Sequence, residues 1–430
     1  MDLHDIYRTL RTGAETLSVQ TAAQKNAALC AVAEALDAGR KTILAANKID
    51  IENARAAGTK ETLVDRLSLD DTRIDGIIAS LRTVIAQSDP VGEEISGWRT
   101  PGGLTIRTVR VPLGVVAIIY ESRPNVTVDA FCLAYKSGNA VLLRGSSSAY
   151  NSNKAIVDII KDALSETADG VPSSIALVKP DGERHDDVQQ ILNAVGEIDV
   201  VLPRGGSHLI KTVVENARVP VIETGSGVCH LYVDEYANLE MAAKIAENAK
   251  IQRPGVCNAI ECILVNEKIA GAFLPLLKKQ FAGRVELRAD DLCYSILEKA
   301  ENSEHSAGGG VRTVLVHACD DDYGFEFLDY ICCIKSVRDV EEAVSYINSH
   351  NTGHSESIVT ENRTNARMFQ TKVDAACVYV NSSTRFTDGG EFGFGAELGI
   401  STQKLHARGP MGIKALTTIK YLIDGDGQIR

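Results

Sequence analysis

The residue whose setting is most typical of a chemical role is Cys257, in the stretch QRPGVCNAIEC at residues 252–262. A reactive cysteine acts as a thiolate, which is favoured at a turn or helix start with a cation nearby. Cys257 follows a Pro-Gly turn, and Arg253 precedes it closely. Local features leave open the alternative of a buried, inert thiol, because cysteine is among the most frequently buried residue types.

The other cysteines lack this setting. Cys262, Cys332 and Cys333 lie in apolar runs typical of strands, and Cys30 and Cys132 lie in helical patterns. The spacing of the ten cysteines, with no C-x-x-C pair, indicates no zinc site, no dithiol redox centre and no disulfide framework. We therefore expect most of them to be buried thiols in a reducing cytoplasm.

Two strand-to-helix turns have the composition of phosphate-binding sites. They are LLRGSSS at 142–148 and LPRGGSHL at 202–209, and each combines an arginine, glycine and hydroxyl groups. Backbone N–H groups and the helix dipole favour an anion at such a turn. Helix capping by Ser146 or Ser207 explains the same pattern equally well. The G-x-G-x-x-G fingerprint is absent, since GFGAELG at 393–399 has a different spacing and comes late in the chain.

One carboxylate and one histidine pair are further candidates. Glu223, in PVIETGSG, lies at a predicted strand end, where a general base would fit, although a hydrogen-bonded or solvated glutamate is the commoner outcome. His350 and His354 are four positions apart, but Gly353 interrupts the helix that would align them. We predict no metal site.

Length and composition set the class of protein. At 430 residues, with 44% hydrophobic and 24% charged residues, the chain is expected to fold into two or three globular domains. A net charge of −12 argues against nucleic acid or an anionic membrane as partner, but not against a small anionic substrate. The N-terminus MDLHDIYRTL has no signal-peptide pattern, and no apolar run reaches the roughly 18 residues of a membrane span. These features favour a cytoplasmic protein.

The order of elements predicts an α/β protein. Helical periodicity fills about the first ninety residues, and the period then changes to two, which predicts a β-hairpin over 96–112. From Gly114 onward, short apolar runs alternate with helical segments, as in parallel sheets covered on both faces. SAGGGVR at 306–312 is typical of a surface loop. The expected strands are GVVAIIY (114–120), NAVLLRG (139–145), IDVVLP (198–203), VPVIET (219–224), HLYVD (230–234), AIECILV (259–265), TVLVH (313–317), ESIVTE (356–361), CVYVN (377–381) and ALTTIKYLI (415–423).

These pieces, in this order, resemble the aldehyde dehydrogenase superfamily: an asparagine after the strand GVVAIIYESRPN, then SGNAVLLR, RGGS, ETGSG and the cysteine turn. The longer stretches VPLGVVAIIYESRPNVTVDA, QRPGVCNAIE, YVNSSTRFTDGGEFGFGAELGIST and TQKLHARGPMG resemble one branch of it. That branch reduces L-glutamyl 5-phosphate to L-glutamate 5-semialdehyde in proline synthesis. The resemblance covers nearly the whole chain.

The resemblance implies a fold and a domain layout. The expected fold is aldehyde dehydrogenase-like, with a Rossmann-type coenzyme domain, an α/β catalytic domain and a small β oligomerisation element. It would assign 1–95 and 113–223 to NADP(H) binding, 224–377 to catalysis, and 96–112 with 378–430 to oligomerisation. A homo-oligomer (dimer or tetramer) is expected, with glutamate 5-kinase as a possible partner that supplies the substrate.

The resemblance also implies residue roles. Cys257 matches the nucleophile, and Asn125 matches the amide that binds the oxyanion together with the Cys257 N–H. Arg144 matches a lysine that contacts the adenosine ribose, and Ser147 stands where NAD-preferring relatives have a glutamate. Neither Arg144 nor Ser147 has a carboxylate, which would repel a 2′-phosphate, so this pair favours NADP(H). The remaining implied contacts are Gly205, Gly206 and Ser207 beside the dinucleotide, Glu326 on the nicotinamide ribose, and Arg253, Arg385 and Arg408 on the substrate.

The implied mechanism begins with attack of the Cys257 thiolate on the acyl phosphate, followed by release of phosphate and hydride transfer from NADPH to the thioester. No hydrolytic water is needed, so Glu223, which matches the base of hydrolytic relatives, has a doubtful role. Cys229 is expected to be a packed thiol. Two alternatives stay open: an aldehyde dehydrogenase that hydrolyses its thioester, and a non-catalytic thiol sensor that keeps only the coenzyme fold.

Overall fold

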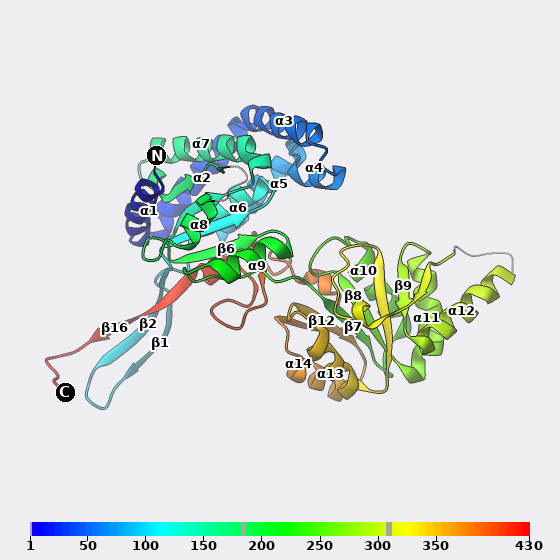
Figure 1. Ribbon diagram of the computed structural model, residues 1–430. Coiled ribbons are helices and arrows are strands. Elements are labelled where there is room, and N and C mark those ends of the chain that lie inside the picture. The colour runs from blue at the N-terminus through cyan, green and yellow to red at the C-terminus, as the bar shows by residue number, and fades with distance from the viewer. Residues whose placement is uncertain (1, 182–185, 307–311) are drawn as a thin grey trace. The chain divides into compact units, whose positions relative to one another are not determined.

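Figure 1 shows the computed structural model, which describes residues 2–181, 186–306 and 312–430. The chain divides into two compact units. The first consists of Met1–Thr224, Gly389–Gly399 and Pro410–Arg430, and the second of Gly225–Asp388 and Ile400–Gly409. In this division the 96–112 hairpin and the end of the chain belong to the first unit, whereas the expected layout gives them a part of their own.

The chain begins with helices, as predicted. In α2, Leu29, Val32 and Leu36 are buried, and the Thr21 side chain accepts a hydrogen bond from the Gln24 N–H, which caps the helix start. The helix ends at Ala38, with Gly39 as its C-cap. The five helices are α1 (Leu3–Ser18), α2 (Ala22–Ala38), α3 (Arg40–Ala56), α4 (Glu61–Leu67) and α5 (Asp71–Ala86).

The first unit contains a parallel sheet in the order β5-β4-β3-β6. The chain proceeds outward from β3 through β4 to β5 and then crosses to the other side of β3, which is the strand order of a Rossmann half. VPVIET was expected as a further strand, but only Val221 pairs, in an isolated bridge to Val201. The bounds are β3 (Val115–Tyr120), α6 (Asn125–Lys136), β4 (Ala140–Arg144), η1 (Ser147–Ala149), α7 (Tyr150–Glu166), η2 (Pro172–Ser174), β5 (Ile175–Leu177), α8 (Asp186–Leu192), β6 (Val200–Arg204) and α9 (Ser207–Asn216).

A three-stranded antiparallel ribbon also belongs to the first unit. The predicted hairpin is confirmed as β1 (Glu94–Arg99) and β2 (Thr105–Pro112). The last strand, β16 (Thr417–Asp424), confirms the strand expected from ALTTIKYLI and pairs with β2 along its whole length. In Figure 1 the three strands run side by side to the chain end.

The second unit is built on a seven-stranded parallel sheet in the order β10-β9-β11-β8-β7-β12-β13. The predicted strands of this part are confirmed, and β9 was missed because ELRA is short and polar. The loop expected at 306–312 falls almost entirely outside the described residues. The bounds are β7 (Cys229–Val233), α10 (Leu239–Ile251), β8 (Ile260–Asn266), α11 (Glu267–Phe281), β9 (Glu286–Ala289), α12 (Asp291–Ser306), β10 (Leu315–His317), η3 (Asp320–Asp322), β11 (Ile331–Val337), α13 (Val340–His350), β12 (Ser355–Val359), α14 (Arg363–Lys372), β13 (Cys377–Val380), η4 (Thr384–Phe386) and β14 (Ile400–Ser401). Along the chain, β15 (Gly409–Pro410) spans the division between the units, and η5 (Ile413–Leu416) belongs to the first unit.

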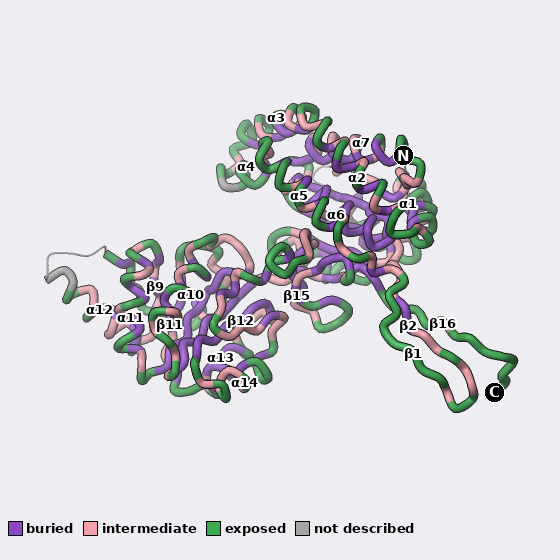
Figure 2. Tube along the Cα trace, turned by 180° about the vertical axis from the view of Figure 1, so that it is seen from behind, coloured by how far each residue is buried: buried purple, intermediate pink, exposed green. Residues whose placement is uncertain are grey.

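The central strands of both parallel sheets are buried along their whole length, as Figure 2 shows. Apolar residues fill both faces of these strands, so each unit has its own core. Within the described part of the chain, no helix is long and apolar enough to cross a membrane.

Candidate active site

Cys257 lies in the turn that joins the end of α10 to the start of β8, as predicted. It is partly exposed, whereas seven of the other nine cysteines are buried and only Cys30 and Cys319 are exposed. A partly exposed thiol on a turn between two rigid elements can meet a substrate and still keep a fixed position.

The Cys257 turn rests on the segment 225–229 of the same unit. The Cys229 thiol donates a hydrogen bond to the carbonyl oxygen of Cys257 at 3.2 Å. A Cβ added to Gly227 would overlap that same oxygen, so the close approach requires glycine. Burial, together with the charge of Glu356, raises the pKa of Cys229 well above its ordinary value. The prediction that Cys229 is a packed thiol is confirmed.

Asn258 anchors the other side of the turn. Its side chain is buried, and its Nδ2 donates to the carbonyl oxygen of Thr387 at 2.9 Å. The Thr384 hydroxyl donates back to the Asn258 carbonyl oxygen at 2.6 Å. These bonds fix the turn to the segment 383–388, which carries Arg385.

Arg385 lies against the Cys257 turn. Its Nη1 donates to Asn258 Oδ1 and its Nε donates to Gln252 Oε1 at 3.0 Å. Burial and the positive charge of Arg253 lower the pKa of Arg385, while negative charge on Cys257 opposes this shift.

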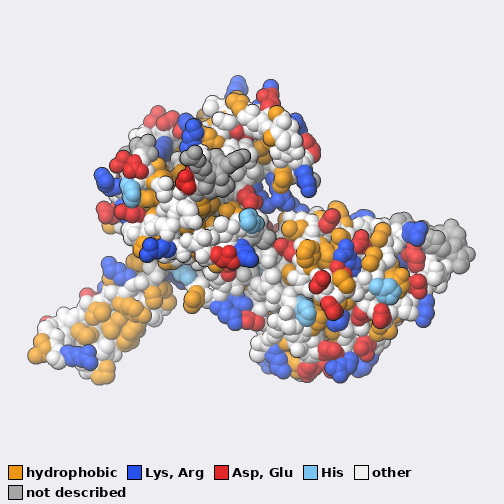
Figure 3. Space-filling view, in the orientation of Figure 1, with side chains coloured by type: hydrophobic (Ala, Val, Ile, Leu, Met, Phe, Trp, Pro, Cys, Tyr) orange, Lys and Arg blue, Asp and Glu red, His pale blue; other side chains and the backbone are white. Residues whose placement is uncertain are grey.

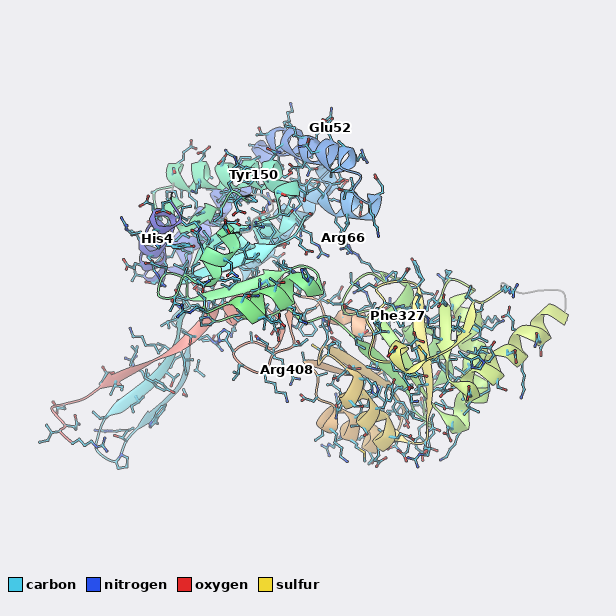
Figure 4. All side chains as sticks on the ribbon, viewed as in Figure 1. His4, Glu52, Arg66, Tyr150, Phe327 and Arg408 are labelled. Carbon is cyan, nitrogen blue, oxygen red and sulfur yellow. The ribbon has the colours of Figure 1, made fainter. Side chains whose placement is uncertain are left out.

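The three predicted substrate arginines separate into two groups. Arg385 lies close enough to Cys257 for their charges to interact, and Arg253 lies close enough to Arg385 to lower its pKa. Arg408, labelled in Figure 4, instead forms an exposed ion pair with Asp374 at 2.8 Å, beside a second pair from Lys404. Its guanidinium is therefore engaged in a surface contact.

Glu326 lies on the loop before β11 and contacts the segment beneath Cys257. Its Oε1 accepts a hydrogen bond from the Gly227 N–H at 2.6 Å, and burial raises the pKa of its carboxyl group. The structure thus brings Glu326 to the Cys257 turn through Gly227.

In the first unit, the carboxyl ends of β3, β4 and β6 lie at one edge of the sheet, where ligands bind in doubly wound folds. The carboxylate of Glu121 lies against the RGGS turn at this edge, and its Oε2 accepts a hydrogen bond from the Gly206 N–H at 3.0 Å. A Cβ on Gly205 would come within 2.6 Å of the Glu121 carboxyl carbon. Sequence reasoning missed Glu121, although its place directly after a buried strand was a signal.

Arg144 is buried in a bidentate ion pair with Asp187, with 2.7 Å from Nε to Oδ2 and 3.2 Å from Nη2 to Oδ1. The ion pair engages the guanidinium that the family resemblance places against the adenosine ribose. Contact of Arg144 with the coenzyme stays a prediction. Its observed role is to hold the start of α8 against β4.

Serine hydroxyls gather at the end of β4. Ser122 lies 3.1 Å from Ser146 and 2.7 Å from Ser148, and Ser146 lies 2.7 Å from Ser148, between hydroxyl oxygens. Ser147 is exposed at the start of η1. Hydroxyls and close-packed glycines at the edge of a Rossmann sheet fit the sugars and phosphates of a dinucleotide.

Asn125 is the first residue of α6, directly after the loop that follows β3. Its Nδ2 donates to Asp129 Oδ2 at 3.3 Å, which orients the amide. Burial raises the pKa of Asp129 to about 6, opposed by the Asn125 bond and by the charge of Arg204. Glu223, the candidate base, is partly buried at the end of the first unit.

The sequence profile of the aldehyde dehydrogenase family matches residues 15–290 and 329–421. The chain belongs to this family of nicotinamide-dependent oxidoreductases. Within it, the chain is 53% identical to the gamma-glutamyl phosphate reductase of Lachnospira eligens over 408 residues, 95% of this chain and 94% of that protein.

The solved structures show the same similarity. The crystal structure of gamma-glutamyl phosphate reductase from Thermotoga maritima is 48% identical and has a TM-score of 0.93, with 100% of both chains covered. An acetylating aldehyde dehydrogenase from Geobacillus thermoglucosidasius is 16% identical with a TM-score of 0.68, over 100% of this chain and 97% of that one. The predicted aldehyde dehydrogenase-like α/β fold is confirmed.

Proposed function

We propose that the protein reduces L-glutamyl 5-phosphate to L-glutamate 5-semialdehyde, with NADPH as reductant and phosphate as the second product. The observation that carries the proposal is the Cys257 turn, which presents a partly exposed thiol close to Arg385. Similarity over nearly the full length to proteins named gamma-glutamyl phosphate reductase supports this substrate.

Cys257 begins the reaction. Its thiolate attacks the carbonyl carbon of the acyl phosphate, the carbon–oxygen bond to phosphate breaks, and a thioester forms. The Cys257 N–H and the Asn125 amide bind the oxyanion of the tetrahedral intermediate. When bound, the coenzyme supplies the hydride that reduces the thioester. The resulting thiohemiacetal then collapses to the semialdehyde and the free thiol.

Phosphate departs as the leaving group, so the acyl group needs no water for its release. This chemistry gives Glu223 no general-base role, and we assign it to the scaffold. Arg253 and Arg385 are favoured over Arg408 as ligands of the substrate phosphate or carboxylate, because Arg408 already pairs with Asp374.

The preference for NADP(H) rests on Ser147. An exposed serine stands where a carboxylate would repel a 2′-phosphate, and the neighbouring hydroxyls of Ser122, Ser146 and Ser148 can donate to phosphate oxygens. Arg144 contributes to this preference indirectly, because its ion pair with Asp187 holds the start of α8 in place. We assign the backbone of the turn Gly205, Gly206 and Ser207 to the dinucleotide, and Glu326 to the nicotinamide ribose.

The ribbon β1-β2-β16 is proposed as the contact surface for a second copy of the chain. Ile95, Trp98, Ile419, Tyr421 and Ile423 expose 47 to 57% of their surface on this ribbon, and hydrophobic side chains gather over it in Figure 3. The Trp98 and Tyr421 rings make an edge-on contact at 6.3 Å. A two-sided exposed ribbon with free strand edges favours association into a homo-oligomer. We further propose glutamate 5-kinase as supplier of the labile substrate.

The test is the reverse reaction. Purified protein with glutamate 5-semialdehyde and NADP⁺ should form NADPH only when phosphate is added, and NAD⁺ should be a poorer acceptor. Oxidation of the semialdehyde at the same rate without phosphate would contradict the proposal and would instead indicate a hydrolytic aldehyde dehydrogenase.

A further inference from the structure

A buried ion pair brackets the Cys257 turn, and no step of the proposed reaction uses it. Lys250 is in the last turn of α10 and Glu261 is in β8, so one partner lies on each side of the turn. Lys250 Nζ lies 2.6 Å from Glu261 Oε2, and the side chains are 0% and 1% exposed. Apolar side chains of similar volume often stabilise a core as well as such a pair does, so we ask what geometry it fixes.

The second oxygen of Glu261 holds a loop of the same unit. Glu261 Oε1 accepts a hydrogen bond from the Leu328 N–H at 3.2 Å. Leu328 has φ 55°, in the left-handed region that is unfavourable for a residue with a Cβ. Phe327, labelled in Figure 4, precedes it and makes an edge-on contact with Phe325 at 5.1 Å. The hydrogen bond to Glu261 therefore secures a loop conformation that the residue would not favour by itself.

The same loop carries Glu326, two residues before Leu328. Glu326 Oε1 accepts from the Gly227 N–H at 2.6 Å, and Gly227 lies against the carbonyl oxygen of Cys257. The contacts thus form a closed ring. It runs from Lys250 to Glu261, on to the Leu328 N–H and Glu326, and then through Gly227 to the Cys257 turn. The two ends of that turn lead back to Lys250 and Glu261.

We propose that Lys250 and Glu261 are positioning residues of the cysteine site, which hold Glu326 against Gly227 and thereby fix the backbone that presents Cys257. The inference rests on the proposed role of Cys257 as the nucleophile. Without the carboxylate, Leu328 loses its acceptor, Glu326 moves away from Gly227, and the segment 225–229 loosens beneath Cys257. Displacement of a reacting group by about 1 Å can cost on the order of 100-fold in rate.

The test compares two double variants of the full chain. Lys250→Met/Glu261→Leu removes the bracketing pair together with the acceptor for Leu328. Lys278→Met/Glu301→Leu removes another largely buried pair of the same unit, which joins α11 to α12 at 3.0 Å outside the ring. Three measurements are made: hydrogen exchange at the peptides with Gly227 and Leu328, the alkylation rate of the Cys257 peptide by iodoacetamide, and steady-state kinetics, which give kcat and KM.

We expect hydrogen exchange at both peptides to be faster by about tenfold or more in the Lys250/Glu261 variant. Loss of the hydrogen bond from the Leu328 N–H to Glu261 should also weaken the bond from the Gly227 N–H to Glu326. The alkylation rate of Cys257 should change, and kcat should fall by about 10- to 100-fold with a smaller change in KM. The Lys278/Glu301 variant should leave exchange at these peptides, alkylation and kcat within about twofold of wild type.

Wild-type exchange at Gly227 and wild-type alkylation of Cys257 in the Lys250/Glu261 variant would overturn the proposal, whatever the activity. Neither readout needs substrate or coenzyme, so failure of the proposed reaction in the wild-type protein leaves this result interpretable. If the double variant does not fold, Glu326→Ala breaks the ring at a partly exposed residue. Unchanged exchange at Gly227 in that variant would overturn the proposal equally.

Discussion

The thiol of Cys229 donates a hydrogen bond to the carbonyl oxygen of Cys257 at 3.2 Å, so a second cysteine supports the turn that presents the proposed nucleophile. The two residues differ in exposure: Cys229 is buried and Cys257 is partly exposed. Burial raises the pKa of Cys229, which therefore stays a neutral donor. The same carbonyl oxygen excludes any side chain at position 227.

Gly227→Ala should displace the Cys257 turn. The added Cβ would overlap the backbone of Cys257, so we expect a loss of about 3 kcal/mol or more in the free energy of unfolding and a large loss of kcat. Gly271→Ala is the control, because that position in α11 has open space around it and should gain up to about 1 kcal/mol. Equal stability of the two variants in urea unfolding would contradict the close approach.

Cys257→Ser should abolish the reductase reaction. A serine hydroxyl in this setting is a far weaker nucleophile than a thiolate, so we expect kcat to fall by at least about a thousandfold. The thermal unfolding midpoint and the dissociation constant of the dinucleotide should stay near the wild-type values, since the swap changes one partly exposed atom. Full retained activity would remove Cys257 from the mechanism.

The fold followed from the sequence where the hydrophobic period was strong. The capped helix α2, the buried strands β3 and β8, and the ribbon strand β16 all lie where they were expected. The errors occur where periodicity is weak: VPVIET is apolar enough for a strand but forms only one bridge, and the unpredicted strands β5 and β9 are too short to stand out.

The site was predictable in its residue types and only partly in its contacts. The turn composition singled out Cys257 and the family resemblance indicated Arg385, but the bidentate pair of Arg144 with Asp187 joins residues 43 positions apart, which no local pattern encodes. The contact of Glu121 with Gly206 likewise depends on the order of strands in the sheet. Side-chain partners across a sheet edge follow from topology, which a single sequence specifies only indirectly.

Arg385→Gln should raise KM for the acyl phosphate by about 10- to 100-fold, because the substrate loses a charge-assisted partner. Arg385→Lys keeps the charge but lacks the planar fork that holds Asn258 and Gln252, so it should recover only part of the loss. Arg408→Gln is the matched control, with KM within about twofold of wild type, since its exposed pair with Asp374 is a weak contact. A larger effect at Arg408 than at Arg385 would reverse the assignment.

Asp129 should make stability depend on pH. Burial raises its folded-state pKa to about 6, above the value of about 3.9 in an unfolded chain. Between these values the folded protein keeps a proton that the unfolded chain has lost, so the contribution of Asp129 is greatest below about pH 4 and declines as pH rises through about 6. The free energy of unfolding of wild type minus that of Asp129→Asn should therefore fall over this window. A difference that is flat with pH would contradict the raised pKa.

Charging the ribbon should dissociate the oligomer. Trp98 and Tyr421 contact each other and are about half exposed, so Trp98→Glu/Tyr421→Glu places like charges in the middle of the proposed contact. We expect light scattering after size-exclusion chromatography to give a lower molar mass for this variant than for wild type. Leu405→Glu is the control, because Leu405 is 84% exposed and belongs to the second unit, whereas the ribbon strands belong to the first. The oligomer proposal fails if wild type is monomeric at tens of micromolar, and the ribbon assignment fails if the double variant keeps the wild-type mass.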